Sequence, residues 1–168
     1  MGSVHALRGT VELSAMRLSD ILKPQNIKIP LESKSKNDAI AELVNLLSSN
    51  GDIADSKKVL EAVLDRESTR TTGIGNGLAI PHGKTAGTAD LVMAIGRPAA
   101  PIDFQSIDGK PVTIIWLLSS PLDKTSSHIH ALARISRLMT IDKFRHSLAA
   151  ARTGQEMFDI IEQQESQL

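Results

Sequence analysis

The chain has 168 residues, with 19 basic and 19 acidic side chains, no cysteine and only 2% aromatic residues. That length suits a single domain with its own core, which has to be built mainly from aliphatic side chains. The balanced charge and the scarcity of aromatic rings argue against nucleic-acid binding, which relies on basic surfaces and on stacking. The lack of cysteine excludes disulfides and thiolate-bound metals, and it fits a reducing compartment.

No segment is apolar for long enough to cross a membrane. The longest apolar run, residues 112–118, contains Thr113 and falls far short of the roughly 20 residues of a spanning helix. Residues 1–15 lack the continuous apolar stretch of a signal peptide, so we expect a cytoplasmic protein without membrane insertion. We interpret residues 1–15 as an N-terminal extension of uncertain order and residues 16–168 as the folded domain.

The first part of the domain reads as a short strand followed by two helices. Apolar and polar residues alternate over 27–31, a strand pattern that its proline weakens. Apolar residues then recur at helical spacing from a candidate N-cap, Ser35 or alternatively Ser33, to about Asn50, where an Asn-Gly pair ends the helix. A second helix is expected from about Asp55 to residues 66–67.

The middle of the chain reads as strands. Residues 78–80 can form a short buried strand, and the apolar runs 91–95 and 112–118 suit central strands. Residues 107–110, between the two longer runs, have the composition of a turn.

After Pro121 the pattern is helical to the end of the chain. Thr125, Ser126 or Ser127 is the expected N-cap of the first of these helices, and Gly154 is expected to separate the last two. Helices, then strands, then helices again predict a single layered α/β domain. We expect a central mixed β-sheet flanked by helices on both faces.

Segment 67–83 contains the most informative feature of the chain, a histidine directly after a proline. His82 follows Leu-Ala-Ile and Pro81, just beyond three alternating glycines. Pro81 fixes its own φ and pushes Ile80 toward the extended region, while the glycines let the backbone pass close to a neighbour or a ligand. We therefore expect the imidazole at the exit of a strand, in a shallow place that another macromolecule can reach.

Two better-known phosphate-binding loops fail on spacing. A Walker A motif has four residues between its first Gly and Gly-Lys, whereas five residues separate Gly77 from Gly83-Lys84. A dinucleotide fingerprint reads Gly-x-Gly-x-x-Gly before a helix, but the glycines of 73–77 alternate and precede a strand. The sequence argues against ATP and NAD, and we expect no cofactor.

Residues 67–83 resemble the phosphorylation-site signature of enzyme IIA of the bacterial phosphoenolpyruvate-dependent phosphotransferase system, in its fructose/mannitol branch. That signature has an acidic or amide residue, an aliphatic-small pair seven residues later, and then aliphatic-Ala-aliphatic-Pro-His-small. It is satisfied at every position, by Glu67, Ile74, Gly75, Leu78, Ala79, Ile80, Pro81, His82 and Gly83. The resemblance covers about residues 16–165 and includes Arg66 and the segment 127–129.

The resemblance implies a fructose/mannitol-type IIA fold and a phosphocarrier that is phosphorylated on His82 by a histidine-phosphorylated HPr-type protein. Imidazole suits this role because it is nucleophilic when neutral, with an unperturbed pKa of about 6.5. Either ring nitrogen of His82 is a candidate. Arg66 matches the family's phosphate-binding arginine, although most arginines at a helix C-terminus only complement the helix dipole.

The resemblance also assigns roles to two further residues. His128 matches the family's second histidine, which lies near the phosphorylated ring. At a helix N-terminus its protonated form is disfavoured and an anion is favoured. Glu67 either orients Arg66 or only completes the signature.

The pair His128 and His130 offers another interpretation, a zinc site shared with His82. In a strand both rings would point to one face. The segment reads as a helix start, however, and there the two rings point about 200° apart. This argues against zinc, and we expect no metal.

Within the family, several roles are open. Segments 18–22 and 127–132 resemble the nitrogen-regulatory branch more closely, so we expect a nitrogen-regulatory IIA component. The alternative is a sugar-transport IIA subunit that passes phosphate to a IIB partner of a fructose/mannitol-type permease. A third interpretation is an interaction module that transfers no phosphate, which the retained His82 argues against. The expected partners are an HPr-type carrier and a IIB domain or regulatory proteins, and the oligomeric state is open.

Overall fold

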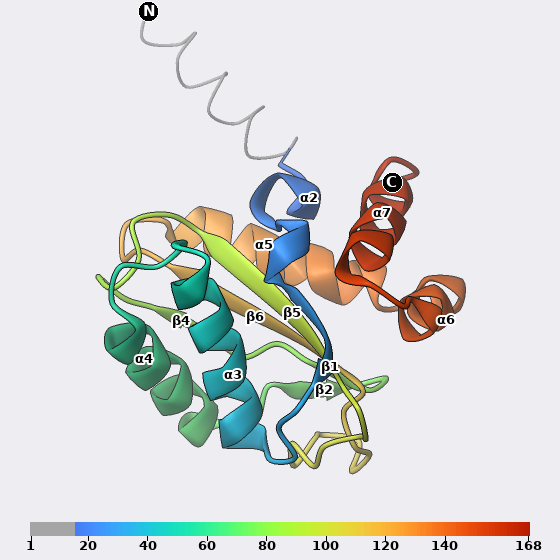
Figure 1. Cartoon of the computed structure of the whole chain (residues 1–168), viewed down its shortest axis with the longest axis horizontal. Coiled ribbons are helices and arrows are strands. Elements are labelled where there is room, and N and C mark those ends of the chain that lie inside the picture. The colour runs from blue at the N-terminus through green and yellow to red at the C-terminus, as the bar shows by residue number, and fades with distance from the viewer. Residues whose placement is uncertain (1–15) are drawn as a thin grey trace, which may run out of the picture.

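The computed structural model describes residues 16–168, which fold into one six-stranded mixed β-sheet with helices on both faces (Figure 1). The strands are β1 (Ile27–Leu31), β2 (Gly73–Gly75), β3 (Leu78–Ala79), β4 (His82–Lys84), β5 (Val92–Pro98) and β6 (Ile114–Ser120). The antiparallel pair β5 and β6 lies at the centre, and β1 runs parallel to β5. β3 and β4 follow one another along the other side of β6, both parallel to it, and β2 pairs antiparallel with β3.

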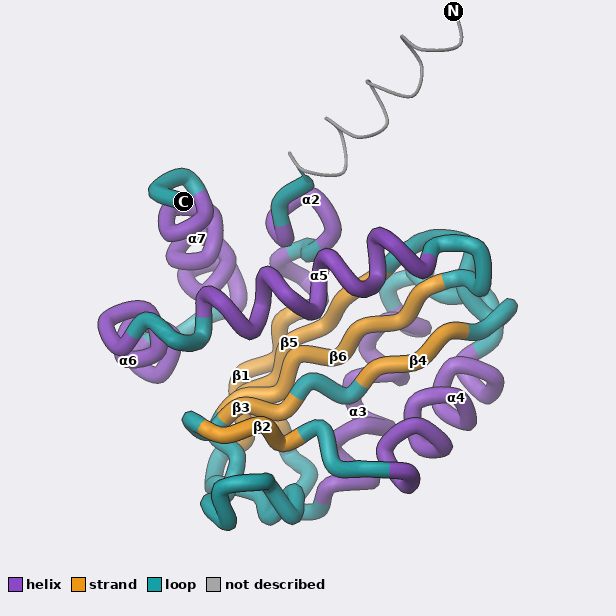
Figure 2. Tube along the Cα trace, turned by 180° about the vertical axis from the view of Figure 1, so that it is seen from behind, coloured by secondary structure: helices purple, strands orange, loops and turns teal. Residues whose placement is uncertain are grey.

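Two groups of helices cover the two faces of this sheet. They are α2 (Leu18–Ile21), α3 (Lys36–Ser49), α4 (Ser56–Thr69), α5 (Thr125–Leu138), α6 (Asp142–Ala150) and α7 (Gly154–Glu165), with a 3-10 turn at Pro24–Asn26. α3 and α4 lie on one face, and α5 lies on the other with α2, α6 and α7 beside it (Figure 2).

The alternation of side chains along β6 explains this arrangement. Ile115 and Leu117 belong to the core under α3 and α4, whereas Trp116 and Leu118 belong to the core under α5. Every residue of β6 is buried, as expected for a central strand covered on both faces. The layered α/β fold with a mixed sheet is therefore confirmed.

The predicted starts of the first two long helices are correct. The side chains of Ser35 and Asp55 accept hydrogen bonds from backbone N–H groups three residues later and cap α3 and α4. Gly51, with a φ of +75°, follows the end of α3. Pro30 is accommodated because β1 is an edge strand, where a missing N–H donor leaves no ladder bond unmade.

Some predicted boundaries are wrong. Lys124, rather than one of the three hydroxyl residues after it, is the N-cap of α5, and no side chain caps that helix. Gly154 is the first residue of α7, capped by Thr153, rather than a separator between helices. Both central strands continue beyond the apolar runs that predicted them, β5 to Pro98 and β6 to Ser120.

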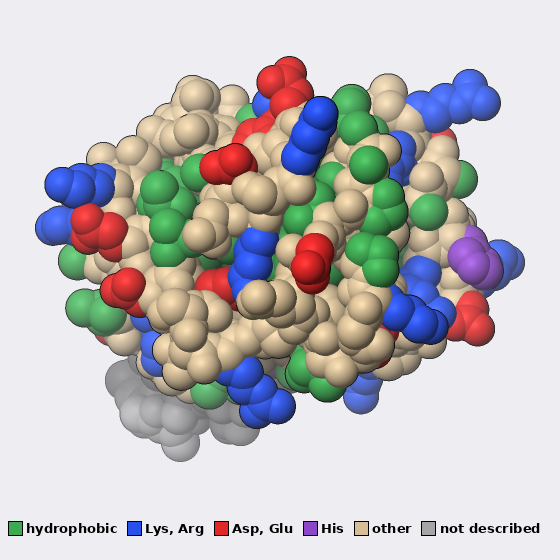
Figure 3. Space-filling view, turned by 90° about the horizontal axis from the view of Figure 1, so that it is seen from below, with side chains coloured by type: hydrophobic (Ala, Val, Ile, Leu, Met, Phe, Trp, Pro, Cys, Tyr) green, Lys and Arg blue, Asp and Glu red, His purple; other side chains and the backbone are tan. Residues whose placement is uncertain are grey.

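The predicted N-terminal extension, residues 1–15, lies outside the described residues. Among residues 16–168, no helix combines the length and the apolar character that crossing a membrane requires. Figure 3 views the molecule from below, and on that face basic and acidic side chains are interspersed, in keeping with the balanced composition.

Candidate functional site

Three elements bring two histidines together at one edge of the sheet: the short strand β4, the end of β6 and the first turns of α5. β4 lies at the edge, between α4 and the start of α5 (Figure 2). His82 opens β4 directly opposite Leu118 of β6. Residues opposite each other in neighbouring strands point to the same face, so His82 lies on the face that α5 covers.

The residue after His82 has little room for a side chain. A Cβ on Gly83 would come within 3.0 Å of the backbone of Ala62 and Val63 in α4. The backbone of α4 therefore packs directly on β4, which holds the strand in place next to the histidine. His82 begins a strand instead of only following one, because β3 and β4 both pair with β6 and flank Pro81.

The ring of His82 is half-buried, and one hydrogen bond decides where its proton sits. Its Nδ1 lies 2.7 Å from the carbonyl oxygen of Ile80. A carbonyl oxygen only accepts, so Nδ1 donates and the neutral ring keeps its lone pair on Nε2. Burial lowers the pKa of His82, the positive charge of Arg66 lowers it further, and the Ile80 hydrogen bond and the negative charge of Glu67 offset only part of this. His82 is therefore neutral at pH 7 and presents a nucleophilic Nε2.

His128 is buried beside it. The ring centroids of His82 and His128 are 5.3 Å apart, with the ring planes at 60°. Nδ1 of His128 lies 2.6 Å from Oγ of Ser120. Burial, followed by the charges of His82 and Lys84, lowers the pKa of His128 to about 4.

The main cause of this neutrality differs from the one expected. A free helix N-terminus was the predicted reason, but the backbone N–H of His128 already donates to the carbonyl of Lys124, at 3.0 Å. His128 stands one position beyond the last unpaired N–H group of α5, and removal from water is the larger effect.

Arg66 lies in the last turn of α4, on the other side of β4. One guanidinium nitrogen, Nη1, donates to the carbonyl oxygen of Arg70 at 2.9 Å. Within residues 16–168 this is the one hydrogen bond that its side chain makes. The charge of Arg66 nevertheless lowers the pKa of His82. The remaining guanidinium N–H groups are available to an anion.

Glu67 does not orient Arg66. Its buried carboxylate accepts hydrogen bonds from the backbone N–H of Thr72 at 3.0 Å and from the Thr72 hydroxyl at 2.5 Å. It also pairs with Nζ of Lys36 at 2.7 Å. Glu67 therefore ties the end of α4 to the start of α3 and to the segment before β2, and its role in the signature is structural.

Sequence reasoning misses two residues beside this site, Lys84 and Ser120. Lys84 stands two positions after His82 on β4, opposite Ser120 of β6. Its Nζ lies 3.4 Å from Oγ1 of Thr125 in α5. The spacing of two in a strand is a signal that places Lys84 on the face of His82. No comparable local signal marks Ser120.

The zinc interpretation finds no support in the geometry. Within residues 16–168, no three His, Asp or Glu side chains converge as a metal site. His128 uses Nδ1 for Ser120, and His130 stands on α5 outside the histidine pair.

The sequence and the fold are both similar to those of known proteins. The family model for "Phosphoenolpyruvate-dependent sugar phosphotransferase system, EIIA 2" matches residues 20–164. A nitrogen regulatory protein of Klebsiella oxytoca is 34% identical over 151 residues, which cover 88% of this chain and 91% of that protein. The fructose-specific EIIABC component of the phosphotransferase system of Bacillus subtilis is 36% identical over 148 residues, 88% of this chain but only 23% of that protein.

Solved structures give the same picture of the fold. The nitrogen regulatory protein IIA-Ntr from Neisseria meningitidis superposes with a TM-score of 0.76 at 29% identity, covering 86% of this chain and 98% of that one. IIA mannitol from Escherichia coli superposes with a TM-score of 0.71 over 83% of this chain and 97% of that one. Its sequence identity is 17%, so that likeness concerns the fold alone.

Proposed function

Because the chain belongs to the type 2 EIIA family of the phosphoenolpyruvate-dependent sugar phosphotransferase system, and is thus a phosphotransfer component, we propose that His82 carries the phosphoryl group. The donor in this proposal is a histidine-phosphorylated protein of the HPr type. The observation that carries the proposal is the hydrogen bond from Nδ1 of His82 to Ile80, which leaves the lone pair on Nε2 of a neutral ring.

The proposed step moves one phosphoryl group between two imidazoles. Nε2 of His82 attacks the phosphorus, the bond between phosphorus and the donor's ring nitrogen breaks, and its electron pair returns to the donor ring. His82 then bears the phosphoryl group on Nε2 and a hydrogen on Nδ1, so its ring gains positive charge. The carbonyl of Ile80, still accepting from Nδ1, stabilises that charge.

Arg66 and His128 complete the proposed site. Phosphoryl transfer depends on in-line positioning and on stabilisation of charge around the phosphorus more than on covalent help. In this proposal the guanidinium of Arg66 binds phosphoryl oxygens through the N–H groups that are not used for Arg70. His128 stays neutral and donates one N–H without adding a charge that would repel Arg66.

Phosphorylation in vitro tests the proposal. Incubation with phosphoenolpyruvate, enzyme I and HPr should label the chain with an acid-labile phosphoryl group. His82→Ala should abolish the label, and His146→Ala, which removes an exposed histidine of α6, should retain it. A label that persists in His82→Ala would refute the assignment. Return of the label to unphosphorylated HPr distinguishes a carrier from an interaction module that transfers nothing.

The proposed branch is the nitrogen-regulatory one. The nitrogen regulatory proteins of Klebsiella oxytoca and Bradyrhizobium diazoefficiens are matched over 91% and 95% of their length, at 34% and 35% identity. The fructose-specific relative is as similar, so a sugar-transport IIA subunit is the second candidate.

Transfer to a IIB domain separates these two roles. In the solved complex from Escherichia coli, enzyme IIA mannitol is bound to phosphorylated enzyme IIB mannitol. If this chain is regulatory, the phosphorylated protein should pass its label slowly, or not at all, to a purified fructose- or mannitol-type IIB domain. Transfer at a rate similar to that from HPr to the chain would favour sugar transport.

A further inference from the structure

Ser120 ends β6, is fully buried, and makes one side-chain hydrogen bond within residues 16–168. Its partner is Nδ1 of His128, 2.6 Å from the serine Oγ. His128 itself is 4% exposed, so water does not readily replace either partner. The two side chains therefore form a buried hydrogen bond that is shielded from water. The hydrogen between them is bonded covalently either to Oγ of Ser120 or to Nδ1 of His128.

The two arrangements differ in what they leave unsatisfied. If the serine hydroxyl donates to Nδ1, its hydrogen is used and the imidazole carries its own hydrogen on Nε2. If Nδ1–H donates to Oγ instead, the hydroxyl hydrogen is buried with no acceptor within the described part of the chain. A buried donor without a partner is strongly disfavoured, so the first arrangement is the stable one.

Burial keeps only one hydrogen on this ring at neutral pH, because it lowers the pKa of His128 to about 4. The choice is thus between two neutral tautomers and not between a neutral and a charged ring. The serine hydroxyl selects between them through its contact with one nitrogen.

We propose that Ser120 is a positioning residue for phosphoryl transfer, which holds His128 in the tautomer that carries its hydrogen on Nε2. The proposal rests on the proposed function and deepens it. Ile80 holds His82 in the opposite tautomer, with the hydrogen on Nδ1. The two adjacent rings therefore differ in their role: one offers a lone pair to phosphorus, and the other offers an N–H to a phosphoryl oxygen. In the wrong tautomer, His128 would offer a lone pair to an anion.

The neighbouring serine provides a matched control. Ser119 is also fully buried, and it points to the opposite face of β6, toward α3 and α4. Its Oγ has no hydrogen-bond partner within residues 16–168. Ser119→Ala and Ser120→Ala each remove one hydroxyl oxygen from adjacent positions of the same strand. Only Ser120→Ala removes a hydrogen bond to a histidine.

The direct test observes the ring nitrogens in the unphosphorylated full chain. Long-range hydrogen–nitrogen NMR correlations distinguish a ring nitrogen that bears hydrogen from one that does not. We expect Nδ1 of His128 to be bare and Nε2 protonated in the wild type and in Ser119→Ala. Ser120→Ala should give a mixture of the two tautomers. A wild-type spectrum with the hydrogen of His128 on Nδ1 would overturn the proposal.

The rate of His82 phosphorylation by HPr is the second readout. Ser120→Ala should slow it about threefold to tenfold, the worth of one neutral hydrogen bond. Ser120→Thr keeps the hydroxyl and should restore most of the rate, and Ser119→Ala should not change it. An unchanged rate in a folded Ser120→Ala protein would overturn the positioning role. Because the tautomers are measured without phosphate, failure of wild-type His82 to accept phosphate refutes the proposed function while the NMR spectrum still decides about Ser120.

Discussion

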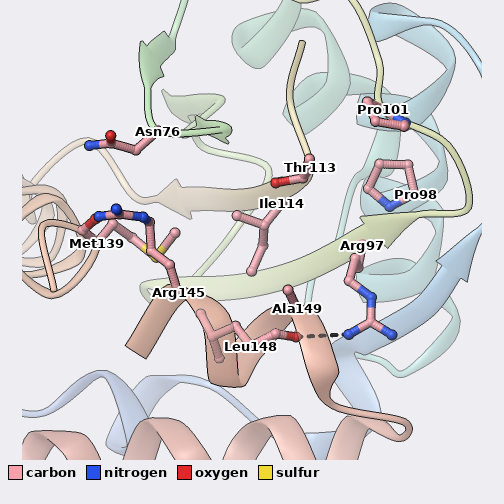
Figure 4. A pocket seen from close by; sticks show the side chains of 10 residues that line it. All are labelled: Asn76, Arg97, Pro98, Pro101, Thr113, Ile114, Met139, Arg145, Leu148 and Ala149. Carbon is pink, nitrogen blue, oxygen red and sulfur yellow. Dashed lines mark hydrogen bonds between the residues drawn. The ribbon is translucent and has the colours of Figure 1, made fainter. Parts of the chain in front are cut away.

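The two ends of β6 bear quite different features. Its C-terminal end lies beside the paired histidines His82 and His128, at an edge of the sheet. Its N-terminal end contributes Ile114 to a cavity of about 130 Å³ (Figure 4). That cavity is lined by Asn76, Arg97, Pro98, Pro101, Thr113, Ile114, Met139, Arg145, Leu148 and Ala149. In its concave shape and its two arginines, this cavity looks more like a ligand-binding site than the surroundings of the histidine pair do.

The hydrogen bonds at the cavity favour a structural role for its arginines. Arg97 donates to the carbonyl of Leu148, in the last turn of α6, at 2.7 Å (Figure 4). Arg145 donates to the carbonyl of Met139, the C-cap residue of α5, at 2.7 Å, and it also pairs with Asp142. The carbonyl of Leu148 also accepts from the backbone N–H of Ala151 at 3.4 Å, so both guanidinium groups bind carbonyls at helix ends and stabilise those ends.

The difference teaches how a site for protein-to-protein transfer is built. A histidine that exchanges phosphate with another protein has to be reachable, so a half-buried ring at a sheet edge suits it better than a hollow. The proposed chemistry depends on proton placement in two imidazoles, whereas the arginines at the cavity bind carbonyl groups at helix ends. Changes at the two ends of β6 should therefore affect different measurements.

The largest effect is expected from Arg66→Ala. An arginine clamp on a transferring phosphoryl group is worth several kcal/mol, so the rate of His82 phosphorylation should fall at least about tenfold. The circular dichroism spectrum should not change, because within residues 16–168 the Arg66 side chain makes one hydrogen bond, to the carbonyl of the exposed Arg70. Arg70→Ala is the control, and its rate of His82 phosphorylation should fall much less. If Arg66→Ala reacts at the wild-type rate, Arg66 does not belong to the site.

The pH dependence of stability is the next test. The pKa of His128 is lowered to about 4, so at mildly acidic pH the unfolded chain takes up a proton that the folded chain does not. The free energy of unfolding should be highest above about pH 6.5 and fall by about 3 kcal/mol as the pH drops to about 4. Urea denaturation at a series of pH values measures this.

Two variants test whether His128 causes that pH dependence. His128→Gln should flatten the slope between about pH 6.5 and 4, and His146→Gln, at an exposed position of α6, should not. Burial also lowers the pKa of His82, which adds a smaller slope of the same sign. Glu42, with its pKa lowered from 4.5 to about 2, acts below about pH 4.5 and overlaps only the lower end of this range. A slope as steep in His128→Gln as in the wild type would show that His128 is not held neutral by the fold.

At the cavity we expect a smaller effect, which lowers stability and leaves the phosphorylation rate unchanged. Arg97→Ala removes a charged donor from the half-buried Leu148 contact and should destabilise the fold by about 1.5 to 3 kcal/mol. Thermal unfolding should shift by several degrees, and the rate of His82 phosphorylation at a temperature where the variant is folded should stay the same. A parallel loss of rate would mean that the two ends of β6 are coupled.

The smallest effect is expected from removal of residues 1–15. The family match begins at residue 20, and these residues hold only scattered apolar side chains, so both melting temperature and phosphorylation should be nearly unchanged. A fall of more than about 4 °C, equivalent to about 1 kcal/mol or more, would contradict the domain boundary that we propose.

Much of the fold was predictable because it depends on neighbours in the sequence. The N-caps Ser35 and Asp55 bond to N–H groups three residues away, and the apolar periods of α3 and β6 repeat within a few positions. The proposed site residues Arg66 and His82 lie in or next to one contiguous signature. Such local interactions can be inferred from the order of residues alone.

Tertiary structure decided what depends on how separate elements pack against one another. It assigned Glu67 to Lys36 and Thr72 instead of Arg66, and it paired Ser120 with His128. Burial by the packed layers, rather than position on a helix, is the main reason that His128 is neutral. A sequence specifies which side chains can give or take a hydrogen, but the partner, the removal of water and therefore the owner of each proton follow only once β4, β6 and α5 are packed together.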